Sequence, residues 1–334
     1  MDIIINNAIL HVLNNDGGKS YISNQELDID SDTCYEFITK HVKKLMNNPA
    51  CREATFADGS DVYEAIQAFK SGEVYFKETA VKIGQKLADI MQKHVDIPSG
   101  DLLIAQFENK GEAYLAVLKL NYKEYFTHEI QLDAEGDAAD NQIVKCRTAL
   151  PFDGGKVEEA VLIPYDPMVL RVLEKPYPVD GEPTYYFSSL FLACEPEISK
   201  KEAAQIIQEI TEEITAKYYN DSAKELARAK AAVIEEAEDE DGALRLESVA
   251  ARAFGDNEEA RDAYVERARE AGLRADLILG ESFVRQQFGR HTFKAENGVE
   301  VKFPAELSDD TDAMEFITEP DGTTTIILKR LRKK

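Results

Sequence analysis

Two apolar segments joined by a short turn constrain the fold of this chain most strongly. Leu102–Phe107 and Ala113–Leu118 flank Asn109-Lys110-Gly111, a sequence typical of a tight β-hairpin. The first segment is apolar at nearly every position, whereas a strand with one solvated face alternates apolar and polar residues. We therefore expect a β-sheet that is covered by helices.

The segments around this hairpin predict further strands and helices in the first part of the chain. Residues 2–30 contain strand-like apolar runs and the turn signal Asn15-Asp16-Gly17-Gly18. Helical spacing of apolar residues follows over 35–45, 62–69 and 73–95. Two more strands are expected at 142–148 and 157–163, joined by Asp153-Gly154-Gly155, and a last apolar element at 185–194.

From about residue 199 the apolar pattern becomes helical. Ser199 and Glu202 have the spacing of a capping box, and Ile207, Ile210 and Ile214 continue one apolar stripe. That stripe fits the core of a domain, which we favour, or the interface of a homodimer. Shorter helices are expected at 245–254 and 258–271, and two hairpins at 291–303 and 314–328.

We therefore predict the α+β class. An N-terminal domain of mixed strands and helices covers residues 1–195. A C-terminal domain, 196–334, has helices followed by two β-hairpins and a basic tail.

The net charge excludes some partners. With 39 Lys and Arg against 63 Asp and Glu, the chain has a formal charge of −24. Nucleic acid and anionic membranes repel such a body, so any contact with DNA needs a local basic patch. The sequence has no apolar run long enough to span a bilayer and no signal-peptide pattern at its start, so we expect a cytoplasmic protein.

No sequence motif identifies a catalytic, cofactor or metal site. A phosphate-binding loop, a dinucleotide fingerprint and a nucleophile elbow are all missing from the sequence. The widely spaced cysteines predict free thiols rather than a zinc site. Two acidic strings begin like calcium loops but lack the required Gly and Glu, so a solvated turn or helix start is preferred. These strings are Asp28-Asp30-Asp32 and Asp133-Glu135-Asp137. Because acids are so abundant, a cryptic metal-dependent, nuclease-like enzyme stays as an alternative.

The basic residues are unevenly placed near the end of the chain. Residues 304–321 contain seven acids and no Lys or Arg, whereas residues 322–334 contain five bases and no acid. Such bases suit contact with DNA phosphates, although the pattern alone fits a solubilising tail better. If the two hairpins pack together, a second basic group can share this surface. The candidate DNA contacts are Arg285, Arg290, Lys294, Lys329, Arg330, Arg332, Lys333 and Lys334.

Interleaved bases and aromatic residues form another candidate nucleic-acid surface. Such residues can stack on single-stranded bases, but an extended strand with core aromatics is the preferred interpretation. The residues concerned are Lys119, Tyr122, Lys123, Tyr125 and Phe126.

The order of segments resembles the NdpA (YejK-like) family of bacterial nucleoid-associated proteins. The matching segments are Ile4–His11, Gly100–Leu103, Tyr114–Leu118, Leu246–Val249, Glu281–Phe283, Val299–Phe303 and Ile326–Lys329. The resemblance implies a non-enzymatic protein of the cytoplasm and nucleoid that binds DNA and influences topoisomerase function. Relatives carry a basic, glycine-containing stretch where this chain has the mixed to acidic segment Cys194–Glu202.

We therefore favour weak DNA contact through local basic patches. The alternative is an acidic adapter that docks a DNA enzyme such as a topoisomerase through residues 235–241 and 304–321.

Overall fold

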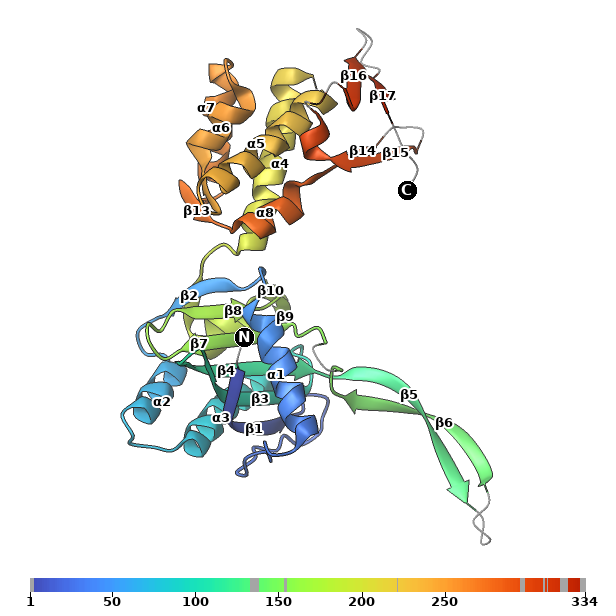
Figure 1. The fold of residues 1–334 in the computed structure, drawn as a ribbon. Coiled ribbons are helices and arrows are strands. Elements are labelled where there is room, and N and C mark those ends of the chain that lie inside the picture. Colours follow the sequence, from blue (N-terminus) through green and yellow to red (C-terminus); the bar gives the residue numbers. More distant parts are fainter. Residues whose placement is uncertain are drawn as a thin grey trace. The chain divides into compact units, whose positions relative to one another are not determined.

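A computed structural model describes residues 3–132, 138–152, 155–220, 222–294, 298–308, 310, 312–318 and 324–330. The chain divides into two compact units, Met1–Glu197 and Ile198–Lys334 (Figure 1). Both helices and strands occur in each unit, which confirms the α+β class.

The first unit is organised around an antiparallel sheet with strand order β1-β3-β4-β7-β8-β2-β11. The apolar hairpin supplies two interior strands of this sheet, and β3 pairs with β4 in the register that opposes Ile104 to Val117. The bounds are β1 Ile3–Leu13, β2 Arg52–Phe56, β3 Gly100–Asn109, β4 Glu112–Asn121, β7 Glu159–Pro164, β8 Leu170–Leu173 and β11 Cys194–Pro196.

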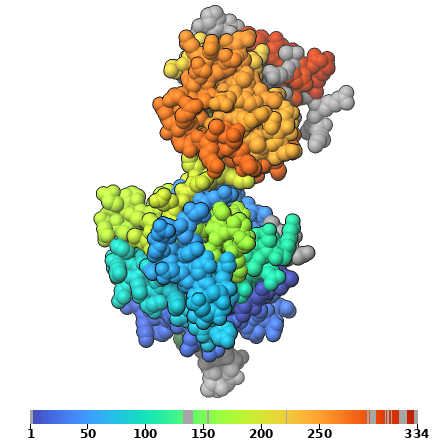
Figure 2. All heavy atoms as spheres, turned by 90° about the vertical axis from the view of Figure 1, so that its left-hand side faces the viewer, coloured from blue at the N-terminus to red at the C-terminus, as the bar shows by residue number. Residues whose placement is uncertain are grey.

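Helices and apolar side chains cover both faces of this sheet, as its sequence predicts. Ile104 and Val117 lie in one apolar cluster with residues of α2 (Asp61–Lys70), α3 (Phe76–Lys93) and the π-helical turn η1 (Phe187–Leu192). Leu103 and Leu118 lie in the opposite cluster with α1 (Asp32–Met46). Alternate residues of β3 and β4 therefore serve two cores, which explains their unbroken apolar sequence. In Figure 2 the blue and cyan surface of α2 and α3 faces the viewer.

Two details of this unit differ from the simplest sequence interpretation. The strand-like segment after Asn15–Gly18 is reduced to a single bridge between Val12 and Tyr21. The strands expected at 142–148 and 157–163 both form, but they do not pair with each other. The first is part of β6 (Ala138–Ala149) and pairs with β5 (Lys123–Leu132), whereas β7 pairs with β4.

Strands β5 and β6 form a two-stranded ribbon of their own, which we call the arm (residues 123–149). Figure 1 shows it as a long twisted ribbon that continues from the end of β4. A small hairpin of β9 (Tyr177–Val179) and β10 (Glu182–Thr184) completes the unit.

The second unit packs its helices around one apolar core. Ile207, Ile210 and Ile214 are buried in this core, so the stripe is core, as we favoured. The capping box of Ser199 and Glu202 is confirmed at the start of α4. The helices are α4 Lys200–Tyr219, α5 Ala223–Asp239, α6 Leu246–Phe254, α7 Glu258–Glu270 and α8 Glu281–Phe288.

Three antiparallel strand pairs complete the second unit. Strand β12 (Ala243–Arg245) pairs with β13 (Asp276–Ile278). The two predicted hairpins are confirmed as β14 (Arg290–Lys294) with β15 (Glu300–Pro304), and β16 (Met314–Thr318) with β17 (Thr324–Leu328). A short 3-10 turn, η2 (Ala305–Ser308), follows β15. Of the helices in the described ranges, none has the length and apolar character needed to cross a membrane.

Candidate nucleic-acid contacts and a buried polar cluster

The candidate DNA contacts occupy two places in the second unit. Arg285 lies in the last turn of α8, and Arg290 is the first residue of β14. Lys329 and Arg330 follow β17 directly. The side chain of Lys294, and Arg332, Lys333 and Lys334 as a whole, lie outside the described residues.

The two hairpins that carry these groups pack against each other. The rings of Phe303 in β15 and Phe316 in β16 lie 5.7 Å apart. Both belong to a small apolar cluster that also contains Met314 and Ala227 of α5. The condition for a shared basic surface is therefore met, although Arg285, Lys329 and Arg330 are each paired with an acidic side chain.

The first of these partners lies on α5. The guanidinium of Arg285 forms an ion pair with Glu238, and the side chains are 51% and 36% exposed. Arg290 is exposed and has no ion-pair partner among the residues that the structure describes. An exposed pair such as Arg285–Glu238 contributes about 0–1 kcal/mol to stability, so other anions can compete for the guanidinium.

The second group of bases is held by the hairpin itself. Lys329 Nζ lies 2.7 Å from Glu315 Oε2, and Arg330 Nη1 lies 3.7 Å from Asp312 Oδ2. All four side chains are at least 37% exposed. Because Glu315 is opposite Ile327 in the register of β16 and β17, the hairpin brings this acid next to the base that follows β17.

The acidic segments that favoured an adapter therefore supply the partners of the candidate DNA contacts. Glu238 belongs to the string 235–241, and Asp312 and Glu315 belong to 304–321. Further acids of the first string bind arginines of the unit, such as Arg252, whose guanidinium lies 3.0 Å from Glu236 and 2.7 Å from Asp239. Much of the acidic surface expected for a protein partner is thus neutralised within the unit.

Glu236 shows how deeply part of this network is buried. Its carboxylate is fully buried and accepts hydrogen bonds from Arg245 and Ser248. Burial alone would raise the pKa of Glu236, but these bonds and the nearby guanidinium charges lower it. This part of the acidic string therefore stabilises the fold and is not available to a partner.

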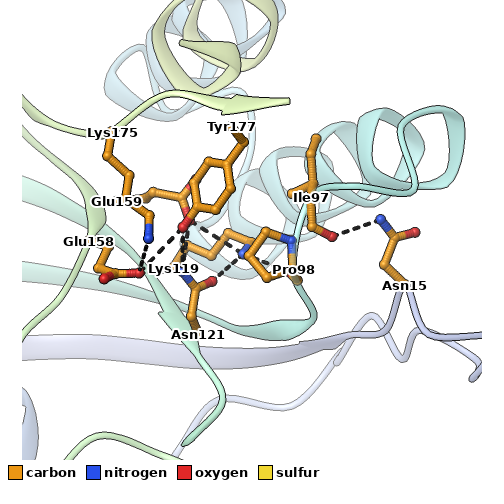
Figure 3. Close-up of polar contacts among 9 residues, drawn as sticks. All are labelled: Asn15, Ile97, Pro98, Lys119, Asn121, Glu158, Glu159, Lys175 and Tyr177. Carbon is orange, nitrogen blue, oxygen red and sulfur yellow. Dashed lines mark hydrogen bonds and ion pairs between the residues drawn. The ribbon is translucent and has the colours of Figure 1, made fainter. Parts of the chain in front are cut away.

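A cluster of buried polar side chains lies in the first unit, where β4 and β7 run side by side (Figure 3). Lys119 and Glu159 are both fully buried, and Lys119 Nζ lies 3.4 Å from Glu159 Oε2. The ammonium also donates a hydrogen bond of 2.7 Å to the Pro98 carbonyl and one to Asn121 Oδ1. The three donors of the ammonium are therefore satisfied inside the protein.

Asn121 connects this pair to the protein surface. Its Nδ2 donates to Glu159 Oε2 at 3.1 Å and to the Tyr177 hydroxyl at 2.9 Å. Glu158, next along the chain, forms an ion pair of 2.8 Å with Lys175. Figure 3 shows these side chains converging from β4, from Glu158 and Glu159 at the start of β7, and from Lys175 and Tyr177 at the start of β9.

The cluster shifts the pKa of several groups in directions that fit a structural role. Burial lowers the pKa of Lys119, although the Glu159 charge opposes this. Burial would raise the pKa of Glu158, but Lys175 and Asn121 lower it to about 2. Burial and the two carboxylates raise the pKa of Tyr177. The cluster therefore holds its charges in fixed states and joins the strands that form it.

The aromatic and basic candidates near this cluster are separated by the structure. Lys119 is buried, and the Tyr122 hydroxyl donates 2.6 Å to Asp101 Oδ1. Tyr125 and Phe126 lie in the arm and are 42% and 75% exposed, so the prediction that they are core aromatics is wrong. The error has a physical cause. The strand is predicted correctly, but it belongs to a two-stranded ribbon on which the described residues place no second layer.

The other candidate sites also have definite places. Asp28 accepts a hydrogen bond from the Asp30 amide and Asp32 begins α1, so this string is the predicted turn and helix start. The string at 133–137 lies outside the described residues. Within the described part of the chain, no group of three or more His, Cys, Asp or Glu could hold a metal ion. The four cysteines are free, as predicted.

The mixed to acidic segment Cys194–Glu202 spans the boundary between the two units. Cys194–Pro196 pairs with β2 as strand β11, and Ser199 caps α4. Its residues are therefore used in the sheet edge and the helix start.

Two comparisons with known proteins both match nucleoid-associated proteins. The family model NA37, described as nucleoid-associated protein YejK, matches residues 9–334. A nucleoid-associated protein of Vibrio atlanticus (strain LGP32) is 24% identical over 119 residues, which cover 35% of this chain and 36% of that protein. The match thus spans about a third of the length of this curated relative.

Proposed function

Since the chain belongs to the family of nucleoid-associated proteins described as YejK, we propose that it contacts duplex DNA at the nucleoid. The proposed contact is weak and local, and it uses the exposed Lys and Arg side chains at the end of the second unit. We propose a binding role in the cytoplasm rather than catalysis.

The observation that carries the proposal is the change of charge sign at the last hairpin. Residues 322–334 contain five bases and no acid. Where the second hairpin ends, Arg330 is exposed and Lys329 is partly exposed. The second unit has 21 bases and 30 acids and the first has 18 and 33, so their net charges are −9 and −15. Because both units are negatively charged, neither can attract DNA over its whole surface. A contact through the basic residues at the end of the second unit is compatible with these charges.

The ion pairs explain why this contact should be weak. To bind phosphate, Lys329 and Arg330 must exchange a carboxylate partner for a phosphate oxygen. The exposed pairs cost about 0–1 kcal/mol each to break, so the exchange is possible but reduces affinity. The surrounding acids repel the DNA backbone at the same time.

The experiment compares duplex binding by three proteins at low salt, using fluorescence anisotropy. In the tail variant, Lys329, Arg330, Arg332, Lys333 and Lys334 are replaced by Ala. A matched control loses five exposed lysines elsewhere: Lys43, Lys77, Lys82, Lys93 and Lys201. We expect the tail variant to lose binding and the control to keep it, whereas equal losses would show that only net charge matters.

A second pair of substitutions changes affinity in the opposite direction. Glu315→Gln with Asp312→Asn removes the carboxylates that hold Lys329 and Arg330, while the bases stay in place. We expect tighter DNA binding by this variant than by a control that removes two exposed acids of the first unit, Glu73→Gln with Asp89→Asn. Equal gains in both variants would refute a specific role for the hairpin end.

A further inference from the structure

His11 lies in β1 with its side chain fully buried, and both nitrogens of its ring have backbone partners. Nε2 lies 3.0 Å from the carbonyl oxygen of Ala80 in α3, and the Ser23 amide donates to Nδ1 at 3.0 Å. A carbonyl can only accept a hydrogen bond and an amide N–H can only donate one, so Nε2 carries the ring proton and Nδ1 carries none. The two partners therefore select one neutral tautomer of the imidazole.

Ser23 belongs to a segment that runs along the outer edge of β1, the first strand in the order of the sheet. We call residues 20–27 the strap. Near its start, the Val12 amide donates to the Tyr21 carbonyl at 3.0 Å, and the Tyr21 amide donates to the Val12 carbonyl at 2.7 Å. At its end, the Leu27 amide donates to the Ala8 carbonyl at 2.8 Å. The bond from Ser23 to the ring lies between these attachments and holds the middle of the strap against β1.

The groups that face the ring are uncharged on every element packed against it. Leu102 of β3 is opposite His11 in the register, and α3 presents Ala80 and Gly84, where an added Cβ would lie 2.5 Å from the ring. Asp101 is opposite Val12, so it lies on the other face of the sheet. The remaining titratable groups of α3 and the strap are exposed, apart from the half-buried Lys86, which is paired with Asp61: Lys77, Glu78, Lys82, Asp89, Lys93, Tyr21 and Glu26.

We propose that His11 is a pH-sensitive switch, in which a proton taken up from water by Nδ1 breaks the bond from the Ser23 amide and releases the strap from β1. The new proton takes the place of the amide hydrogen, so the imidazolium and this bond exclude each other. The apolar surroundings give the imidazolium no counter-charge, whereas opening of the strap lets water solvate it. Release also frees the backbone groups of Val12 that pair with Tyr21, and so uncovers part of the sheet edge.

The direction of the pH dependence follows from the burial of the ring. Burial lowers the pKa of His11 below its ordinary value of 6.5, and the bond to Ala80 opposes this effect. Above that value the ring is neutral whether the strap is closed or open, so closure has its full stability. Below it the open form takes up a proton and the closed form does not, so closure is lost as the pH falls. For an open form with the ordinary pKa, the equilibrium constant for opening rises up to about tenfold between about pH 7.5 and pH 5.5.

Hydrogen exchange of the full chain at these two pH values, measured by mass spectrometry and corrected for the intrinsic effect of pH on amide exchange, tests the proposal. Peptides of the strap should show the rise of about tenfold in opening, and peptides of β3 and β4 in the same samples should not. His11→Gln cannot take up a proton in this range and should abolish the rise. His128→Gln, at an exposed histidine of the arm, is the matched control and should keep it.

Ser23→Pro removes the amide donor and leaves His11 in place, so it serves as a second variant if His11→Gln does not fold. Its strap should already be open at about pH 7.5, with little further change at lower pH. A strap that opens equally at both pH values in the parent would overturn the proposal, as would an undiminished rise in His11→Gln or a strap that stays closed in Ser23→Pro. A rise of the same size in β3 and β4 would also overturn it, because protonation would then open the whole unit rather than the strap.

Discussion

The buried pair of Lys119 and Glu159 allows one prediction to be worked through. Lys119→Met keeps an unbranched side chain but removes the ammonium, which leaves the Glu159 carboxylate buried without its cation. The Pro98 carbonyl and the Asn121 amide oxygen each lose a donor as well. Breaking one partner of a buried ion pair costs about 3–5 kcal/mol. Because both side chains are fully buried, we expect a loss of stability in that range.

The double variant Lys119→Met with Glu159→Gln separates this charge effect from packing. It removes the uncompensated carboxylate, so it should be more stable than Lys119→Met alone by about 1–3 kcal/mol. Urea-dependent hydrogen exchange, measured by mass spectrometry on peptides of β4 and β7, reports the first unit without interference from the second. Lys77→Met, at an exposed lysine of α3, should change stability by less than about 0.5 kcal/mol.

Two outcomes would refute the reasoning. A loss below about 1 kcal/mol in Lys119→Met would mean that the ammonium is not held as a buried charge. A double variant as unstable as the sum of its single variants would mean that Lys119 and Glu159 do not interact.

Three further perturbations test the fold. The pKa of Glu158 is lowered to about 2, so its contribution to stability is complete above its ordinary pKa near 4.5 and is lost as the pH falls toward 2. Glu158→Gln should therefore remove up to roughly 3 kcal/mol of the stability that depends on pH in this range. In hydrogen exchange the stability of the variant should vary less with pH than that of the parent. An unchanged dependence on pH would contradict this prediction. Gly84→Ala would raise the helix propensity of α3, but the added Cβ would lie 2.5 Å from the ring of His11. We therefore expect a lower melting temperature, which corresponds to a loss of about 1–3 kcal/mol of stability. A higher melting temperature would show that the His11 ring can move away. Ser199→Ala removes the cap that Glu202 completes and should destabilise α4 by about 1 kcal/mol in hydrogen exchange, whereas the exposed Ser189→Ala should not.

Much of the fold follows from local patterns in the sequence. The unbroken apolar residues of β3 and β4 predict a sheet covered on both faces, and the capping box at Ser199 marks the start of α4. These signals are local, because periodicity and capping depend on residues close in sequence. The pairing of β6 with β5 depends on contacts across the chain, so local patterns alone could not select it.

The candidate site was less predictable for a related reason. The sequence shows which segments are basic and which are acidic, but not that Arg285 reaches Glu238 across 47 residues. One pair could have been anticipated, because the turn signal at 319–322 sets the hairpin register that places Glu315 near Lys329. The burial of Lys119 could not be predicted from the neighbouring sequence, because a lysine in an apolar strand can be either exposed or buried.

The salt dependence of duplex DNA binding by the full chain tests the central claim most directly. The logarithm of the binding constant should fall linearly with the logarithm of salt concentration, with a slope of about −0.9 per phosphate neutralised. If all eight candidate bases take part, the slope approaches about −7, and the five-residue tail variant should flatten it by up to about 4.5. Binding at low salt with this loss of slope is the predicted result. No binding at low salt, or a slope that the tail variant leaves unchanged, would contradict contact through the basic end of the second unit.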